Sequence, residues 1–425
     1  MSVTVIAGAR LYGNDAQDIV ITDGVISAIG GPRPQGATVI TADGLVALPG
    51  LVDMHTHVRE PGGEDAETIQ SGSEAAAAGG FVAIHAMANT DPVADTAGVV
   101  EQVWNRGREV GLVDIYPVGA VTVGLEGERL SQMAAMAMSQ AAVRIFSDDG
   151  LCVHDPVLMR RALEYVKTFD GVIAQHAQDP GLTAGSQMNE GVVSAELGLT
   201  GWPAVAEESI VARDVLLAEH VDSRLHVCHV STRGSVEIIR WAKSRGIQVT
   251  AEVMPHHLLL TEELVRSYDP LFKVNPPLRT HADVEALRAG LADGTIDVVA
   301  TDHAPHPHEA KECEWEAAAM GMIGLETALP IVHKAMVGTG LMNWEDVARV
   351  MSETPARIAG DHGHGRPLAV GEPANITLYD PEGSWSVDPH AMASLSHNSP
   401  YGGMDMPGSV VATFLRGKRT YGGEK

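Results

Sequence analysis

An alternation of short apolar segments with longer amphipathic ones constrains the fold of this 425-residue chain more than any other feature. The apolar segments are strand-like in length and composition, and they occupy residues 50–55, 80–87, 113–123, 142–146, 171–176, 224–230, 248–253 and 297–301. Segments with the spacing of amphipathic helices lie between them, at residues 67–78, 94–109, 156–168, 209–219, 234–244 and 282–291. Eight strand-then-helix repeats over roughly 300 residues predict an α/β fold, a (β/α)8 barrel of the TIM type. An open doubly wound sheet fits less well, because no glycine-rich phosphate loop follows the first strand.

The two ends of the chain resemble each other and differ from this middle region. Both contain β-branched runs separated by glycine-containing turns, at residues 2–6, 18–22, 25–29, 38–41, 374–379 and 410–415. We therefore expect a small β-sandwich domain that is assembled from residues 1–50 and 361–425. The central barrel domain then comprises residues 51–360.

Charge and composition argue against several classes of partner and location. Lys and Arg total 29 against 55 Asp and Glu, and the resulting net charge of −26 disfavours binding to nucleic acid or to an anionic membrane. No apolar stretch approaches the roughly 18 residues of a membrane helix. The first ten residues do not resemble a secretion signal, and the three cysteines provide no disulfide framework. We expect a cytoplasmic protein.

Histidines and aspartates gather where the predicted strands end. Residues two apart on a strand point to the same side, so His55 and His57 can hold one ion together. Other strands end in residues of the same types, namely Asp148 with Asp149, His176, His229 and Asp302. Because the carboxyl ends of barrel strands meet on one rim, four histidines and two carboxylates are expected to converge there.

Six ligands are too many for one tetrahedral zinc ion, which takes three protein ligands in catalytic sites and four in structural ones. They suit two metal ions about 3.5–4 Å apart that share a carboxylate and a hydroxide. A water molecule between two cations loses its proton near neutral pH and becomes a nucleophile. A neighbouring carboxylate can take that proton and pass it to a leaving nitrogen. The pattern predicts hydrolytic attack on an amide-like carbon.

Each of these residues by itself has a simpler interpretation. A single histidine in a strand, such as His176 or His229, is usually a hydrogen-bonded core residue. The run Asp148-Asp149-Gly150 is by itself a turn signal. The joint pattern favours a metal site, because five strands of one repeating architecture each end in a ligand-type residue.

Five longer motifs contain these residues. They are Asp53-Met-His55-Thr-His57-Val-Arg59-Glu60-Pro61-Gly62, Met87-Ala-Asn89-Thr-Asp-Pro92, Phe146-Ser-Asp148-Asp149-Gly150, Val274-Asn275-Pro276-Pro277-Leu278-Arg279 and Asp302-His303-Ala-Pro-His306. Together they resemble the cyclic amidohydrolases, and more narrowly the dihydroorotases of the class I bacterial type. The resemblance covers nearly the whole chain, although Ala88 stands where that family has proline.

The resemblance implies a role for each of the metal-ligating residues. His55, His57 and Asp302 would hold one zinc ion, His176 and His229 would hold a second, and Asp149 would bridge the two. Asp149 is chosen over Asp148 because its separation from His176, 176 − 149 = 27 residues, is the spacing expected for the class. Hydantoinases and allantoinases bridge with a carboxylated lysine instead, and this chain has no lysine near that strand end.

The resemblance also implies a set of substrate contacts. Residues that match positions contacting the substrate are His57, Arg59, Asn89, Asn275, His306, Met320 and Gly321. Arg59, Asn89 and His306 would hold a carboxylate, to which the planar fork of arginine is suited. Asn275 and the backbone at residues 320–321 would contact the amide groups of a pyrimidine ring, and Met320 stands where phenylalanine is expected.

The implied activity is the reversible, zinc-dependent hydrolysis of (S)-dihydroorotate to N-carbamoyl-L-aspartate. A bridging hydroxide would be the nucleophile and Asp302 the general base and acid. The reverse direction closes the ring in pyrimidine biosynthesis. Two alternatives stay open: another cyclic-amide hydrolase such as an allantoinase or hydantoinase, and a non-catalytic relative that partners aspartate carbamoyltransferase. A homo-oligomer and an association with aspartate carbamoyltransferase are further expectations.

Overall fold

An eight-stranded sheet combines strands from both ends of the chain in the computed structural model, which describes residues 3–422. Ser2, part of the first predicted strand, lies outside the described residues. The strands are β1 (Val3–Leu11), β2 (Ala16–Thr22), β3 (Val25–Ile29), β4 (Thr38–Thr41), β5 (Val46–Pro49), β16 (Ile376–Ser386), β17 (Asp405–Leu415) and β18 (Lys418–Tyr421). Strand β5 pairs with β1 on one side and antiparallel with β16 on the other, so the two ends of the chain are joined by backbone hydrogen bonds.

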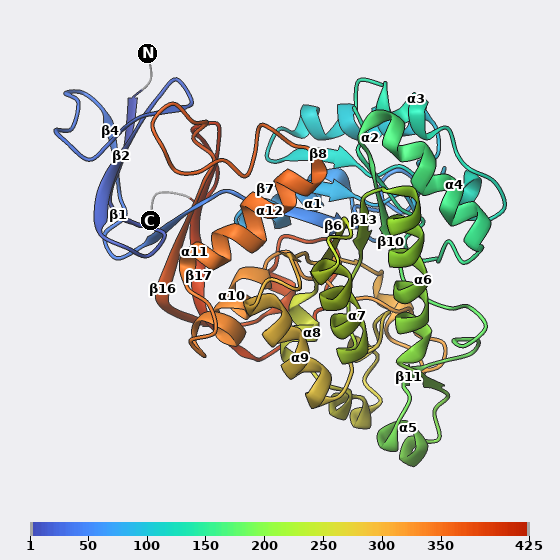
Figure 1. The fold of residues 1–425 in the computed structure, drawn as a ribbon. Helices are drawn as coiled ribbons and strands as arrows, with labels where there is room; N and C mark the ends of the chain where they lie inside the picture. Colours follow the sequence, from blue (N-terminus) through green and yellow to red (C-terminus); the bar gives the residue numbers. More distant parts are fainter. Residues whose placement is uncertain (1–2, 423–425) are drawn as a thin grey trace.

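This terminal sheet has a hydrophobic core of its own. Side chains from both ends of the chain, including Ile6, Ile19, Ile376 and Phe414, are buried in one cluster. Figure 1 shows the sheet to one side of the helices and strands of the middle region. The sequence prediction that both termini contribute to one β-structure therefore agrees with the strand pairing.

The middle of the chain forms parallel strands in two groups. One sheet contains β6 (Leu51–Thr56), β7 (Phe81–Ala86) and β8 (Asp114–Pro117), and the other contains β9 (Ile145–Phe146), β10 (Val172–Gln175), β13 (Leu225–Val227), β14 (Val249–Val253) and β15 (Val298–Val299). Parallel bridges connect Gly119 with Phe146 and Thr56 with His303, which links the edges of the two sheets. One buried cluster takes side chains at or next to each of these strands: Met54, Met87, Val118, Ile145, Ala174, Cys228, Met254 and Val298.

Helices follow most of these strands and cover them (Figure 1). The longer ones are α1 (Ile69–Ala78), α2 (Ala97–Val110), α4 (Pro156–Val166), α6 (Val205–Val221), α7 (Arg233–Ser244) and α9 (His281–Ala292). Shorter helices are α3 (Met133–Ala137), α8 (Pro255–Leu259), α10 (Ala328–Val332), α11 (Trp344–Ala348) and α12 (Thr354–Ala359). Local sequence explains several starting points, because Thr68, Asp155, Thr232 and Thr280 each accept a hydrogen bond from a backbone N–H of the first turn. All six predicted helices are confirmed within a few residues.

Two strands of the middle region are much shorter than the sequence predicts, whereas strands β1, β16 and β17 of the terminal sheet are longer than predicted. Within residues 113–123 only Asp114–Pro117 form a strand, β8, and within residues 224–230 only Leu225–Val227 do, β13. In both segments the chain leaves the extended conformation several residues before the predicted end. His229, two residues past β13, has φ = 33°. A further excursion between β10 and α6 holds β11 (Met188–Asn189), α5 (Val192–Leu197) and β12 (Gly201–Trp202). Strands of two residues are too short to leave a periodic pattern in the sequence.

The described part of the chain, residues 3–422, contains no helix that is both long and apolar enough to cross a membrane.

Candidate active site

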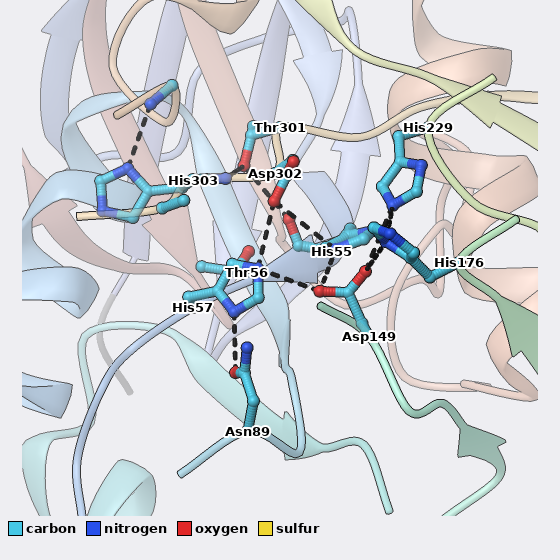
Figure 2. Close-up of polar contacts among 12 residues, drawn as sticks. His55, Thr56, His57, Asn89, Asp149, His176, His229, Thr301, Asp302 and His303 are labelled. Carbon is cyan, nitrogen blue, oxygen red and sulfur yellow. Dashed lines mark hydrogen bonds and ion pairs between the residues drawn. The ribbon is translucent and has the colours of Figure 1, made fainter. Parts of the chain in front are cut away.

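The six predicted metal ligands lie at the carboxyl ends of five parallel strands. His55 is in β6 and His57 follows it directly, while His176 directly follows β10. The others lie two or three residues beyond their strands, namely Asp149 after β9, His229 after β13 and Asp302 after β15. All six side chains are buried. Figure 2 shows them converging on one small region.

Asp149 lies at the centre of this arrangement (Figure 2). Its Oδ2 atom is 3.3 Å from Nε2 of His55 and 3.3 Å from Nε2 of His57. Its Oδ1 atom is 3.2 Å from Nδ1 of His176 and 3.2 Å from Nε2 of His229. The two oxygens of one carboxylate thus face two different pairs of histidines. Each pair forms, with Asp149, a group of donor atoms that could hold a metal ion.

The distances between these donor atoms fit zinc coordination. Atoms bound tetrahedrally at 2.0–2.1 Å from a zinc ion lie about 3.3 Å from one another. The four distances from Asp149 to histidine nitrogens are 3.2–3.3 Å. Asp302 belongs with the first pair, since its Oδ1 atom lies 3.1 Å from Nε2 of His57 and 3.6 Å from Nε2 of His55. The predicted division of the ligands into two sets agrees with this geometry.

His55 provides a second test of whether a metal fits. Its Nδ1 atom is hydrogen-bonded to Oε1 of Glu252 at 2.6 Å. Its buried Nε2 atom makes no hydrogen bond and faces the carboxylate oxygens of Asp149 and Asp302 at 3.3 and 3.6 Å. A buried polar atom without a partner is unfavourable by about 1–3 kcal/mol, so such atoms are rare. A neutral imidazole that donates through Nδ1–H presents a lone pair at Nε2, which is the form that binds a metal ion.

The electrostatics of the site favour ionised carboxylates. Burial alone would raise the pKa of Asp149, but His55, His176 and His229 outweigh it and hold the pKa of this carboxyl well below its ordinary value. The pKa of Asp302 is likewise lowered by His55 and His57 against the effect of burial. Although burial opposes protonation of His55, the carboxylates of Asp149, Glu252 and Asp302 raise its pKa well above the ordinary value. The carboxylates thus favour a positive charge at His55, and a metal ion bound at its Nε2 atom would take the place of the proton.

The two consecutive aspartates have different surroundings. Asp148 accepts hydrogen bonds from the backbone N–H groups of Val121 and Thr122, at 2.8 and 2.9 Å, and from the Thr122 hydroxyl. These bonds fix the loop that follows β8, and they leave Asp148 turned away from the histidines. Asp149 contacts the histidines instead.

The predicted carboxylate-binding residues lie beside the first set of ligands. Nδ1 of His57 is 2.9 Å from Oδ1 of Asn89. Nε of Arg59 donates to the carbonyl oxygen of Pro305 at 3.0 Å, which places the guanidinium next to His306. Burial first, and then the charge of Arg59, lower the pKa of His306 to about 3, so His306 is neutral at physiological pH.

The predicted ring-binding residues lie on two neighbouring segments, since the Gly321 N–H donates to the carbonyl oxygen of Lys273 at 2.9 Å. Nε2 of His306 is 2.9 Å from the carbonyl oxygen of Met320, so residues 320–321 lie against this histidine. Asn275 donates from Nδ2 to Oε1 of Gln178 at 3.1 Å, and its Oδ1 atom is buried without a partner. The structure thus brings Asn275 close to the second set of ligands, because Gln178 also bonds His176.

Two residues in contact with the ligands were not predicted. Gln178 accepts from Nε2 of His176 at 2.6 Å, and Glu252 links His55 to His226, whose Nε2 atom is 3.1 Å from Oε2 of Glu252. A sequence signal existed for Glu252, since it is a carboxylate inside the buried apolar strand β14. Gln178 lies two residues after His176, and nothing in the local sequence indicates that its side chain contacts this histidine.

Replacing Glu252 with glutamine is expected to weaken zinc binding about 10- to 100-fold, because partners that orient a ligating histidine have effects of this size. The amide removes the negative charge that both histidines face, and its NH2 group requires the nitrogen of His55 or His226 that it faces to become an acceptor. Competition with a chromophoric chelator measures the affinity. Glu67→Gln is the matched control, because Glu67 is also buried and paired with a histidine, His303, that is outside both donor groups. Equal zinc affinity in both variants would contradict the orienting role of Glu252.

Comparisons with known proteins agree with this geometry. A family model described as dihydro-orotase-like matches residues 44–235. A dihydroorotase from Streptomyces coelicolor is 66% identical over 421 residues, which cover 99% of this chain and 98% of that protein. A dihydroorotase from Leifsonia xyli is 65% identical over 98% of this chain and 95% of its own length. A dihydroorotase from Mycobacterium tuberculosis is 56% identical over 99% of this chain and 98% of its own length.

Solved structures show similarity to the whole chain. The L-hydantoinase (dihydropyrimidinase) of Arthrobacter aurescens matches with a TM-score of 0.87 and 27% identity, over 99% of this chain and 96% of that one. The dihydropyrimidinase of Brevibacillus agri matches with a TM-score of 0.83 and 20% identity, over 98% of this chain and 94% of that one. The second similarity is evidence for a shared mixed α/β fold alone.

Proposed function

Since the chain belongs to the dihydroorotase family and is a hydrolase that acts on cyclic amides, we propose that it catalyses the reversible hydrolysis of (S)-dihydroorotate to N-carbamoyl-L-aspartate. The ring-closing direction is a step of pyrimidine biosynthesis. Within the structure, one observation carries the proposal. A single carboxylate, Asp149, faces two pairs of histidines at zinc-like separations on the rim of the parallel strands.

The proposal includes a closed (β/α)8 barrel and a β-sandwich domain that is built from both termini. Support for the barrel comes from the parallel bridges that link the two sheets at both edges and from the buried cluster that the eight strands share. Support for a separate terminal domain comes from the sheet of both chain ends and its own hydrophobic cluster. The proposed division stays at residues 1–50 with 361–425, and 51–360.

The proposed cofactor is a pair of zinc ions. His55, His57 and Asp302 would hold the first ion, His176 and His229 the second, and Asp149 both. Two zinc ions at this position would supply a nucleophilic hydroxide near neutral pH and would polarise the carbonyl group that is attacked. The mixture of imidazole and carboxylate donors suits zinc.

Asp302 is the proposed general base and acid. Its carboxylate lies beside the first set of ligands, and its lowered pKa leaves it ionised and able to accept a proton. It takes the proton of the attacking water and delivers it to the ring nitrogen as the carbon–nitrogen bond breaks. In the ring-closing direction the same carboxylate removes the proton from that nitrogen.

Arg59, Asn89 and His306 are the proposed contacts of the substrate carboxylate, together with His57. A dihydroorotate anion approaches a protein of net charge −26, so it needs a local cation. Arg59 supplies that charge close to His306 and can bind a carboxylate with two hydrogen bonds. The unpartnered Oδ1 atom of Asn275 is an acceptor for a ring N–H group. The backbone at residues 320–321, on the neighbouring segment, is the second proposed ring contact.

Zinc quantitation coupled to a dihydroorotate hydrolysis assay tests the proposed function. The purified chain should contain about two zinc ions, lose its activity on treatment with a chelator, and recover activity when zinc is returned. A substrate panel with hydantoin and allantoin is the control for specificity. Faster turnover of either compound than of dihydroorotate would contradict the proposal. A purified chain with neither zinc nor activity would instead support the alternative of a non-catalytic relative that partners aspartate carbamoyltransferase.

The proposal also keeps the expectations of a cytoplasmic homo-oligomer and of an association with aspartate carbamoyltransferase. Sedimentation of the chain alone and with that enzyme tests both assemblies.

A further inference from the structure

The connection between β16 and β17 leaves the terminal sheet and packs near the active site. Val387 and Tyr401 in this connection are buried in a cluster with Val274 and Met322, which flank the proposed ring-binding residues. Polar contacts fix the connection nearby. Leu395 N–H donates to Glu67 at 3.0 Å, and the Ser394 hydroxyl also donates to Glu67.

Asn398 is the point at which this connection meets the proposed substrate contacts. Its Oδ1 atom accepts from the backbone N–H of His306 at 3.2 Å. Its Nδ2 atom donates to the carbonyl oxygen of Ala304 at 3.0 Å and to that of Gly321 at 3.2 Å. The side chain is only 4% exposed, and these three bonds use both of its amide hydrogens and its carbonyl oxygen.

The two segments that Asn398 joins have little freedom to separate or rotate. Ala304 N–H donates to the carbonyl oxygen of Met322 at 2.9 Å, which sets the two segments side by side. Gly321 has φ = 140°, and a Cβ atom at this position would lie 2.7 Å from Nε2 of His306. The backbone at Gly321 therefore lies directly against the His306 ring, and Asn398 bonds the backbone of both segments.

We propose that Asn398 is a positioning residue for substrate binding, which holds His306 and the backbone at residues 320–321 at the spacing that the dihydroorotate anion requires. This inference rests on the proposed function. Asn398 touches neither the metal ligands nor, in the proposed arrangement, the substrate. Its effect should therefore fall on substrate affinity, because it fixes groups that bind the substrate, and should leave the zinc content unchanged.

Asn398→Asp is the decisive variant. Aspartate keeps an acceptor for His306 N–H but cannot donate to the carbonyl oxygens of Ala304 and Gly321, which it would repel. We expect KM for dihydroorotate and for N-carbamoyl-L-aspartate to rise about tenfold or more, because small displacements of positioning groups have large effects. We expect kcat to change by less than about threefold. Asn398→Ala should raise KM in the same direction.

Ser396→Ala is the matched control. The Ser396 hydroxyl is buried in the same connection and donates to the carbonyl oxygen of Ala66 at 2.7 Å, away from residues 304–306 and 320–323. The Ser396→Ala variant should have a lower melting temperature than the wild type and an unchanged KM. A KM in the Asn398 variants equal to that of Ser396→Ala, or variants of both kinds at Asn398 that fail to fold, would overturn the inference and leave Asn398 a purely structural residue. A wild-type chain that does not turn over dihydroorotate would instead refute the proposed function.

Discussion

Replacing Asp302 with asparagine is expected to lower kcat for dihydroorotate hydrolysis by about 10³-fold while much of the zinc stays bound. General acid–base catalysis contributes about 10²- to 10⁴-fold, and an asparagine amide cannot accept the proton of the attacking water. The change is otherwise conservative. Asp302 has φ = 46°, in the left-handed region that asparagine also tolerates, and its backbone N–H, which donates to the carbonyl oxygen of His55, is unaltered.

Turnover of Asp302→Asn should be measured at saturating substrate and added zinc, with the zinc content of the same sample determined in parallel. Asp302 is also a proposed ligand, so some loss of zinc affinity is expected, and added zinc separates that effect from the loss of the base. Asp302→Asn with kcat within about tenfold of the wild type would remove Asp302 from the role of proton carrier.

Replacing Asp149 with asparagine is expected to lower both activity and zinc content, the activity to the background of the assay. Asp149 faces His55 and His57 with one oxygen and His176 and His229 with the other. Asparagine offers one oxygen and a donor NH2 group, so at least one pair of histidines loses its shared anionic ligand. The lost negative charge also weakens the attraction for the second ion.

Asp148→Asn is the matched control for Asp149→Asn. Asp148 is the preceding residue and is equally buried, but its oxygens accept hydrogen bonds from Val121 and Thr122. Its replacement should lower the melting temperature, because the charged acceptor of these buried hydrogen bonds is lost. It should leave the zinc content near that of the wild type. Full zinc content and activity in Asp149→Asn would refute the shared-ligand arrangement.

Much of the fold followed from local patterns. All eight apolar segments of the middle region contain a parallel strand, and the helices between them begin near capping residues that the sequence displays, such as Thr68 and Thr280. The strand ends could not be placed, as the early end of β13 at Val227 illustrates. The reason is that the geometry of neighbouring elements, rather than local propensity, decides where the chain stops being extended.

The residues of the proposed ligand set could be selected from the sequence because residue type, strand position and family motif point to the same side chains. His55 and His57 are two residues apart, so on a strand their side chains point to the same side. His176 and His229 became candidates because the carboxyl ends of barrel strands lie on one rim. The residues that orient these side chains could not be predicted from the sequence. Glu252 lies 197 positions from His55, and Asn398 lies 92 positions from His306, so no local pattern connects them.

The sequence by itself determined which segments would be strands or helices and which residue types would stand at the strand ends, because periodicity and motif spacing are properties of neighbouring residues. The tertiary structure decided which atoms meet: that Asp149 rather than Asp148 faces the histidines, that Nε2 of His55 is left without a partner, and that a segment from the C-terminal region bonds His306 and Gly321. These choices depend on side-chain directions and on contacts between distant segments, which arise only when the strands are packed side by side.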